Sequence, residues 1–292
     1  MGKIGDYMEL FKIKQSALLI FSGFLGVFAA GYTNIDWYKL TLFIIASILS
    51  VFGTTGLNMY YDRDIDAIMF RTKKRPLPDQ RLDPDEAFFV SLLMAVIGIL
   101  IGFEINFWTG LAVFLGFFID AFVYTVLLKR RTVLNIVMGA FAGGMLPFGG
   151  YVMVTNYPDV YAILLMFMVA LWAIIHIWFI AIYYIEDYRE ANIPMFPVIY
   201  GESKTAKLGI LVVLLIEGLV FYMWYTNFIG ICTIVISGLM TLGIIASIIR
   251  YLRNKSKETV RKIFKFLSPY LGITLLSIAC ERSFLLMIGI SL

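Results

Sequence analysis

Asn58, Asp62 and Asp66 stand at four-residue intervals in the stretch NMYYDRDIDAIMFRTKKRP, residues 58–76, which we call the first acidic segment. On an α-helix each step of four residues turns about 40° past a full circle, so we expect the three side chains to share one face over about 12 Å. Aligned carboxylates repel one another and require positive charge nearby. Such oxygen ligands suit Mg²⁺, which typically joins a few carboxylates to substrate phosphates.

Four basic residues follow this acidic face, namely Arg71, Lys73, Lys74 and Arg75. Arginine offers bidentate donors and lysine a compact charge for phosphate oxygens. A solvated loop would explain the bases but not the alignment of the acids. We therefore predict that the acidic face binds Mg²⁺ and that Arg71, Lys74 and Arg75 bind a diphosphate.

The elements that position these residues are membrane helices. The chain has 292 residues, of which 61% are hydrophobic and 15% charged, and its mean hydropathy is +0.87. Soluble domains rarely have this composition. Apolar runs of about 20 residues, enough to cross a bilayer as a helix, predict an all-α integral membrane protein whose single domain, 1–292, is one bundle. The nine predicted spans are 16–32, 38–60, 86–103, 107–128, 133–154, 161–185, 206–226, 228–249 and 263–290.

Basic residues predict the orientation of this bundle. Of the 24 Lys and Arg residues, 22 lie before the first span, after the even-numbered spans or within a few residues of these segments. Because cytoplasmic loops are enriched in Lys and Arg, we expect a multi-pass protein of the cell membrane with a cytoplasmic N-terminus, an external C-terminus and the acidic face on the cytoplasmic side. The net charge of +4 then describes a rim next to anionic membrane lipid, and it does not indicate a nucleic-acid partner.

A second acidic segment, EDYREANIPMFPVIYGESK, residues 186–204, follows the sixth span. Like the first, it combines acids, bases and prolines, and four spans separate the two segments. This repetition predicts two four-helix pseudo-repeats followed by a ninth helix.

The pattern N-x-x-x-D-x-x-x-D after the second span resembles the first motif of the UbiA superfamily of intramembrane prenyltransferases. The stretches LKRRTVLNIVMGAFAGGMLPFGGY, 128–151, and LWAIIHIWFIAIYYIEDYREANIPMFPVIYG, 171–201, resemble its protoheme IX farnesyltransferase branch, the haem O synthases. The likeness is strong over 53–201 and rests only on hydropathy in the last three spans. It implies that a farnesyl or longer prenyl group passes from its diphosphate to a vinyl group of haem B. Mg²⁺ would promote ionisation to an allylic cation, and water would capture the resulting cation to give haem O.

The resemblance also implies roles for residues of the sixth span and the second acidic segment. Asp187 and Tyr188 occupy the position of an Asp-Tyr pair, so Asp187 is expected as a second metal or water-bridge ligand and Tyr188 as a substrate contact. Arg189 or Lys204 would reach phosphate. His176 is the only histidine; it would ligate or orient the haem, bond a propionate or accept a proton, with a packing role as the alternative.

Further candidates are less specific. Lys129, Arg130 and Arg131 would meet diphosphate or haem propionates, although they serve equally well as topology signals. The aromatic faces of Trp172 and Tyr183 are able to stabilise an allylic cation. Asp120, inside the fourth span, should face protein or a wet cavity, and its sequence context suggests no role. The residues 173–175 replace prolines common before the histidine in relatives, which predicts a straighter helix here.

Other functions remain open at this level. A UbiA-type prenyltransferase acting on a quinone precursor or a glycerol lipid is one alternative, although relatives that prenylate aromatic acids or quinone precursors have a denser D-x-x-x-D in the second acidic segment. A secondary transporter is another, and its charged residues would lie near the middle of the membrane. A structural subunit of a respiratory complex would not depend on the acidic face. The acids stand at the ends of spans, which favours an enzyme.

Overall fold

A computed structural model describes residues 2–31 and 35–289 of the chain. Within these residues, nine helices are long and apolar enough to cross a membrane. They are α2 Ile13–Gly31, α3 Trp37–Tyr61, α5 Pro84–Ile105, α6 Phe107–Phe117 continued by η2 Phe118–Leu128, α7 Asn135–Thr155, α8 Val160–Tyr183, α11 Glu202–Tyr225, α12 Ile231–Asn254 and α13 Lys257–Met287. The nine predicted spans are thus confirmed, and their predicted ends at Tyr32 and Ile290 lie outside the described residues.

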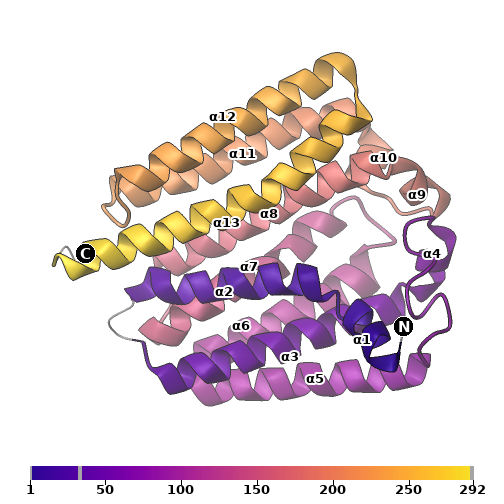
Figure 1. Ribbon diagram of the computed structural model, residues 1–292, viewed down its shortest axis with the longest axis horizontal. Helices are drawn as coiled ribbons and strands as arrows, with labels where there is room; N and C mark the ends of the chain where they lie inside the picture. Colours follow the sequence, from indigo (N-terminus) through magenta and orange to yellow (C-terminus); the bar gives the residue numbers. More distant parts are fainter. Residues whose placement is uncertain (1, 32–34, 290–292) are drawn as a thin grey trace.

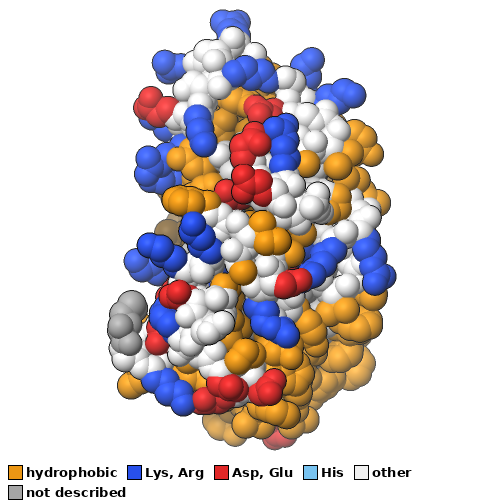
Figure 2. Space-filling view, turned by 90° about the vertical axis from the view of Figure 1, so that its right-hand side faces the viewer, with side chains coloured by type: hydrophobic (Ala, Val, Ile, Leu, Met, Phe, Trp, Pro, Cys, Tyr) orange, Lys and Arg blue, Asp and Glu red, His pale blue; other side chains and the backbone are white. Residues whose placement is uncertain are grey.

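Four short helices gather at one end of the bundle, near the N-terminus, whereas the C-terminus lies toward the other end (Figure 1). They are α1 Lys3–Leu10, α4 Arg63–Ile68, α9 Ile185–Glu190 and α10 Phe196–Tyr200. Figure 2 looks onto this end, where basic and acidic side chains are scattered over the surface and hydrophobic ones border it. We call it the charged end. Short helices follow both the second and the sixth span, but the pseudo-repeat itself stays a prediction.

The spans begin at local sequence signals. Asp36 accepts hydrogen bonds from the backbone N–H groups at the start of α3, and Asp159 does the same for α8. Asp83 caps α5, whose first residue is Pro84. Side-chain oxygens at these positions satisfy backbone donors that have no partner within the helix, and proline is tolerated at the first helical position. These caps fix where each helix leaves its loop.

Small residues let neighbouring spans approach closely. A Cβ atom on Gly98 of α5 would lie 2.8 Å from the carbonyl oxygen of Ala46 on α3, and one on Gly26 of α2 would lie 2.8 Å from Cα of Pro147 on α7. Backbone contact through small residues is typical of helices packed in a membrane. The pairs α3–α5 and α2–α7 therefore form tight walls in the half of the bundle that carries the first acidic segment.

The fourth span changes its winding before it reaches the charged end. Residues Phe118–Leu128 form a π-helix, and the N–H of Lys129 donates to the carbonyl of Tyr124, five residues back, at 2.8 Å. A π-helix is rare and is often associated with functional sites. Here it brings Asp120 and Lys129, at its two ends, to the same neighbourhood as the first acidic segment.

Candidate active site

The predicted acidic face lies where α3 passes into α4. Asp62 stands between the two helices with φ −92° and ψ −2°. Its N–H donates to the carbonyl of Asn58 at 3.0 Å, and its carbonyl accepts from the N–H of Asp66 at 2.8 Å. Helical hydrogen bonding therefore connects the three residues in the predicted spacing. Asp62 and Asp66 are both buried.

Each buried carboxylate has a basic partner. Arg75 donates to Oδ2 of Asp66 at 2.6 Å, and the ammonium of Lys129 pairs with Oδ2 of Asp62. Burial by itself lowers the pKa of Lys129, but the Asp62 carboxylate outweighs it and the pKa is raised above its ordinary value. The other oxygen of Asp62, Oδ1, is buried and has no hydrogen-bond partner in the described part of the chain. The alignment of acids predicted positive charge nearby. Arg75 supplies it from the first acidic segment, and Lys129 supplies it from the end of the fourth span.

Asn58 is held by the π-helix. Its Nδ2 donates to Oδ2 of Asp120 at 2.8 Å, and its Oδ1 accepts from the hydroxyl of Thr125 at 2.7 Å. Asp120, for which sequence reasoning gave no role, therefore orients the first residue of the acidic face. Sequence reasoning missed Thr125 altogether, since no spacing connects residues 58 and 125.

Lys12 is a further residue at this site that the sequence did not indicate. It occupies a left-handed backbone conformation, φ 46°, between α1 and α2. Burial, followed by the positive charges of Arg75 and Lys129, lowers its pKa to about 8, while the Asp62 and Asp66 carboxylates oppose this shift. This electrostatic coupling places Lys12 among the charges around the acidic face.

The second acidic segment meets the first through Arg71. The backbone N–H of Arg71 donates to Oδ2 of Asp187 at 3.3 Å, and its guanidinium lies 3.4 Å from the hydroxyl of Tyr188. The same guanidinium stacks 4.7 Å from the ring centre of Tyr184. Two segments that are separated by four spans are therefore in contact at the charged end.

Other predicted residues lie farther from the acidic face. Arg130 binds both oxygens of Asp64, at 2.6 and 2.7 Å, and this hydrogen bonding lowers the pKa of the Asp64 carboxyl. Arg189 pairs with the exposed Glu186 inside α9. Lys74, Arg131 and Lys204 are exposed and form no ion pair with the described residues. Their predicted contacts with substrate stay predictions.

The donor set fits Mg²⁺ in its chemistry but is not assembled around a metal. Within residues 2–31 and 35–289, no three His, Cys, Asp or Glu side chains are grouped in a way that could hold an ion. The unpartnered oxygen of Asp62, the Asp66 carboxylate and the Asn58 amide are oxygen ligands of the kind Mg²⁺ prefers. Lys129 and Arg75 now balance these carboxylates, so both would have to turn aside for a cation to enter.

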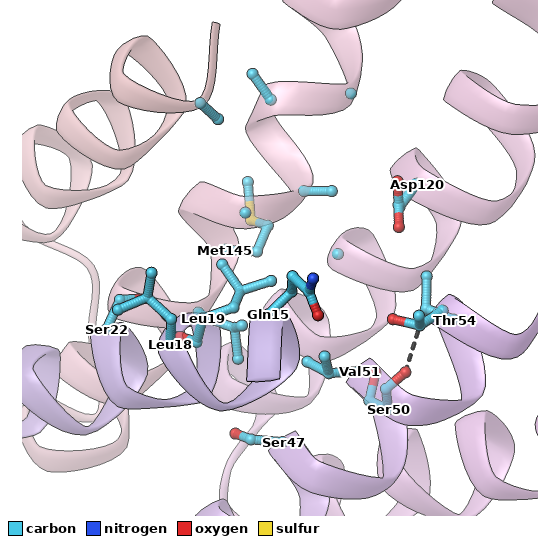
Figure 3. A pocket seen from close by; sticks show the side chains of 18 of the residues that line it. Gln15, Leu18, Leu19, Ser22, Ser47, Ser50, Val51, Thr54, Asp120 and Met145 are labelled. Atoms are coloured by element: carbon cyan, nitrogen blue, oxygen red, sulfur yellow. Dashed lines mark hydrogen bonds between the residues drawn. The ribbon is translucent and has the colours of Figure 1, made fainter. Parts of the chain in front are cut away.

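A cavity of about 590 Å³ opens between α2, α3, α6, α7, α8 and α13. Asp120 and Tyr124 line it beside the acidic face, and most of the remaining wall is apolar. Figure 3 shows Leu18 and Leu19 of α2 together with Val51 and Thr54 of α3 around this space, and Asp120 across it. The cavity is therefore an apolar space that ends in charged groups.

His176 and Trp172 lie on the α8 wall of this cavity. Their rings stack with centres 4.8 Å apart at 15°, and Nε1 of Trp172 donates to the carbonyl of Leu267 at 2.6 Å. The Nδ1 atom of His176 is buried, and none of residues 2–31 and 35–289 forms a hydrogen bond with it. Helix α8 continues unbroken through this region, as expected. Tyr183 lies outside the cavity and packs against Phe264, with ring centres 5.5 Å apart.

Solved structures share this arrangement of helices. One, described as "Structural and mechanistic insights into the biosynthesis of Digeranylgeranylglyceryl phosphate synthase in membranes", matches with a TM-score of 0.79 at 20% identity over 97% of this chain and 99% of its own. A UbiA homologue from Archaeoglobus fulgidus bound to GPP and Mg2+ matches with a TM-score of 0.67 at 17% identity over 94% of this chain and 99% of its own. At these identities the likeness concerns the fold.

Sequence relatives are closer. A protoheme IX farnesyltransferase from Korarchaeum cryptofilum is 36% identical over 282 residues, which cover 97% of this chain and 95% of the relative. One from Pyrobaculum neutrophilum is 39% identical over 281 residues, covering 94% and 99%. Residues 19–269 match the model of the UbiA prenyltransferase family. With nine apolar helices and this similarity along almost its whole length, the chain is a multi-pass membrane enzyme that belongs to the UbiA prenyltransferase family.

Proposed function

We propose that this protein transfers a farnesyl or longer prenyl group from its diphosphate to a vinyl group of haem B, with addition of water, to give haem O. The observation that carries the proposal is an apolar cavity whose wall includes both Asp120, which hydrogen-bonds Asn58 of the acidic face, and the only histidine. The relatives named protoheme IX farnesyltransferase support the acceptor. The UbiA homologue bound to GPP and Mg2+ supports a prenyl diphosphate and a divalent metal.

Asn58, Asp62, Asp66 and Asp187 are the residues we propose to hold Mg²⁺. When bound, this ion neutralises charge on the leaving diphosphate. Asp62 has a free buried oxygen for this purpose, and Asp187 lies in the segment that Arg71 joins to the first. The C1–oxygen bond of the prenyl diphosphate breaks, and the diphosphate leaves with the electron pair.

Basic side chains bind the diphosphate in this proposal. Lys129 and Arg75 now pair with the carboxylates of the acidic face. With those carboxylates holding Mg²⁺, Lys129 and Arg75 would be free to bind phosphate oxygens, for which arginine and lysine are suited. Arg71 and Lys12 add charge from two further elements. If the basic rim follows the positive-inside rule, the charged end, and with it the active site, faces the cytoplasm, and the N-terminus lies on the same side.

The two flanks of the cavity take different substrates. Residues of α3 line it in a continuous face that starts next to Asn58, so we assign the prenyl chain to this flank. The α8 flank with His176 and Trp172 receives the acceptor. The terminal vinyl carbon bonds to C1 of the prenyl group, the neighbouring carbon becomes a cation, and water adds there and loses a proton. The unpartnered Nδ1 of His176 is available to accept that proton.

The proposal is tested with the purified protein in lipid nanodiscs, supplied with Mg²⁺, farnesyl diphosphate and one acceptor at a time. The acceptors are haem B, a quinone precursor and a glycerol phosphate lipid, and products are identified by mass spectrometry. We expect a haem product whose mass includes one farnesyl group and one water, and none after addition of EDTA. Prenylation of another acceptor with unmodified haem B would contradict the proposal.

A further inference from the structure

The cavity is closed at the end farthest from the charged end. The lining residues that lie farthest toward this end are Ser22 on α2, Phe43 on α3, Ala112 on α6 and Leu146 on α7. Phe43 lies 15 residues before Asn58 on one continuous helix. At 1.5 Å per residue this separation corresponds to about 22 Å along α3. A linear chain held at the acidic face and running along α3 therefore ends at Phe43.

Beyond this level the walls are made of backbone. A Cβ atom on Gly150 of α7 would lie 3.1 Å from the backbone nitrogen of Val27 on α2 and would clash with the carbonyl of Gly23. Gly26 meets Pro147 in the same way. Because the two helices touch through their main chains, no side-chain movement can open a path between α2 and α7.

Phe43 is the side chain that closes the cavity at the far end of its α3 wall. It is 1% exposed, and its ring carbons lie 3.3 Å from an ideal Cβ on Gly23 and 3.5 Å from one on Gly149. Behind it lie other members of a buried cluster, among them Leu40 and Met153. The ring packs on glycine backbone at two points, but the side chains of Leu40 and Met153 lie behind it, so its removal would lengthen the cavity.

Ser47 lies one helical turn nearer to the charged end and also lines the cavity (Figure 3). It is 1% exposed, and its hydroxyl has no hydrogen-bond partner among the described residues. Its small size leaves space in front of the Phe43 ring, and a larger side chain would fill that space.

We propose that Phe43 sets the longest prenyl chain that the protein accepts and that Ser47 leaves room for the last isoprene unit of that chain. The inference rests on the proposed function only in taking a prenyl diphosphate as the ligand. It assigns the limit on prenyl chain length to the ring of Phe43 at the closed end of the cavity.

The test compares wild type with Phe43→Ala and Ser47→Leu, using geranyl, farnesyl and geranylgeranyl diphosphate with Mg²⁺. We expect Phe43→Ala to raise the preference for geranylgeranyl over farnesyl diphosphate about 10-fold or more, and Ser47→Leu to lower the preference for farnesyl over geranyl by a similar factor, because cavities discriminate chain length at this scale. Preference is measured as the ratio of kcat/KM values and as the ratio of Kd values without acceptor. Ser47→Leu keeps the test decisive if the loss of a buried ring unfolds Phe43→Ala.

Phe52→Ala is the matched control. Phe52 lies on the same helix but stacks on Phe11, with ring centres 5.4 Å apart, and does not line the cavity. This variant should keep the wild-type ratios. Unchanged ratios in folded Phe43→Ala or Ser47→Leu would overturn the inference. Because the Kd values need no acceptor, failure to modify haem B would count against the proposed function alone.

Discussion

The first and second acidic segments share the charged end, yet their carboxylates are held differently. Asp62 and Asp66 are buried, and each pairs with a base, one of them from another span. Asp187 is only partly buried and accepts one backbone N–H at 3.3 Å, and its neighbour Glu186 is exposed. A buried charge is tolerated only when it is paired. We infer that the carboxylates of the first segment, which we call the fixed segment, are held in place before substrate arrives even though their basic partners must be exchanged, whereas the carboxylates of the second segment are held less firmly.

The largest loss of activity is expected when a carboxylate of the first acidic segment is replaced. Asp62→Asn keeps the size of the side chain but removes the charge that faces Lys129 and the metal. We expect kcat/KM for the prenyl diphosphate to fall about 10²- to 10³-fold, the range seen when one preorganised electrostatic contact is lost. Steady-state kinetics over a series of Mg²⁺ concentrations measures this loss. Asp64→Asn is the control, because Asp64 is exposed and paired with Arg130. An equal fall in kcat/KM for Asp62→Asn and Asp64→Asn would show that the buried carboxylate has no special role.

A smaller effect is expected in the second segment. Asp187→Asn should lower kcat/KM about 10-fold, within the range found when a supporting interaction at a metal is removed, and raised Mg²⁺ should restore part of the activity. The same kinetic series measures it, with Glu186→Gln as the control. A loss larger than that of Asp62→Asn would show that the second segment, not the first, carries the metal.

The smallest effect concerns a charge near the fixed segment. Burial and the neighbouring Arg75 and Lys129 lower the pKa of Lys12 to about 8, so its ammonium loses its proton as the pH rises through that value. We expect kcat/KM for the diphosphate, which reports the free enzyme, to decline several-fold from pH 7 to pH 9. Lys12→Arg stays charged in this range and should remove the decline. Lys14→Arg should retain it. A decline that persists in Lys12→Arg would exclude Lys12 as its source.

Local sequence patterns were sufficient for the spans and for the helical spacing of Asn58, Asp62 and Asp66. Apolar runs of bilayer length allow few other structures, since a helix satisfies its own backbone in lipid. The helical spacing of Asn58, Asp62 and Asp66 could also be predicted from the sequence, because helical hydrogen bonds continue through the junction of α3 and α4. Both predictions concern residues near one another in the chain.

Partners from distant parts of the chain could not be predicted. Asp120 reaches Asn58 only because the fourth span changes to a π-helix, and no pattern in FIDAFVYTVLL indicates that change. Lys12 comes to the site through one left-handed residue between two helices. Arg130 was expected either to meet diphosphate or haem propionates or to serve as a topology signal, and its pairing with Asp64, 66 residues away, could not be read from the sequence.

The π-helix makes the site depend on the number of residues as well as on their identity. Deleting one residue between Asp120 and Tyr124 would leave each of the proposed ligands in the chain. Asp120 and Lys129 would then be one residue closer in sequence, so their directions around the helix axis would change relative to each other. Asp120 and Lys129 could then no longer meet Asn58 and Asp62 together. A one-residue gap at this place in a related sequence is therefore a warning that its active site is built in another way.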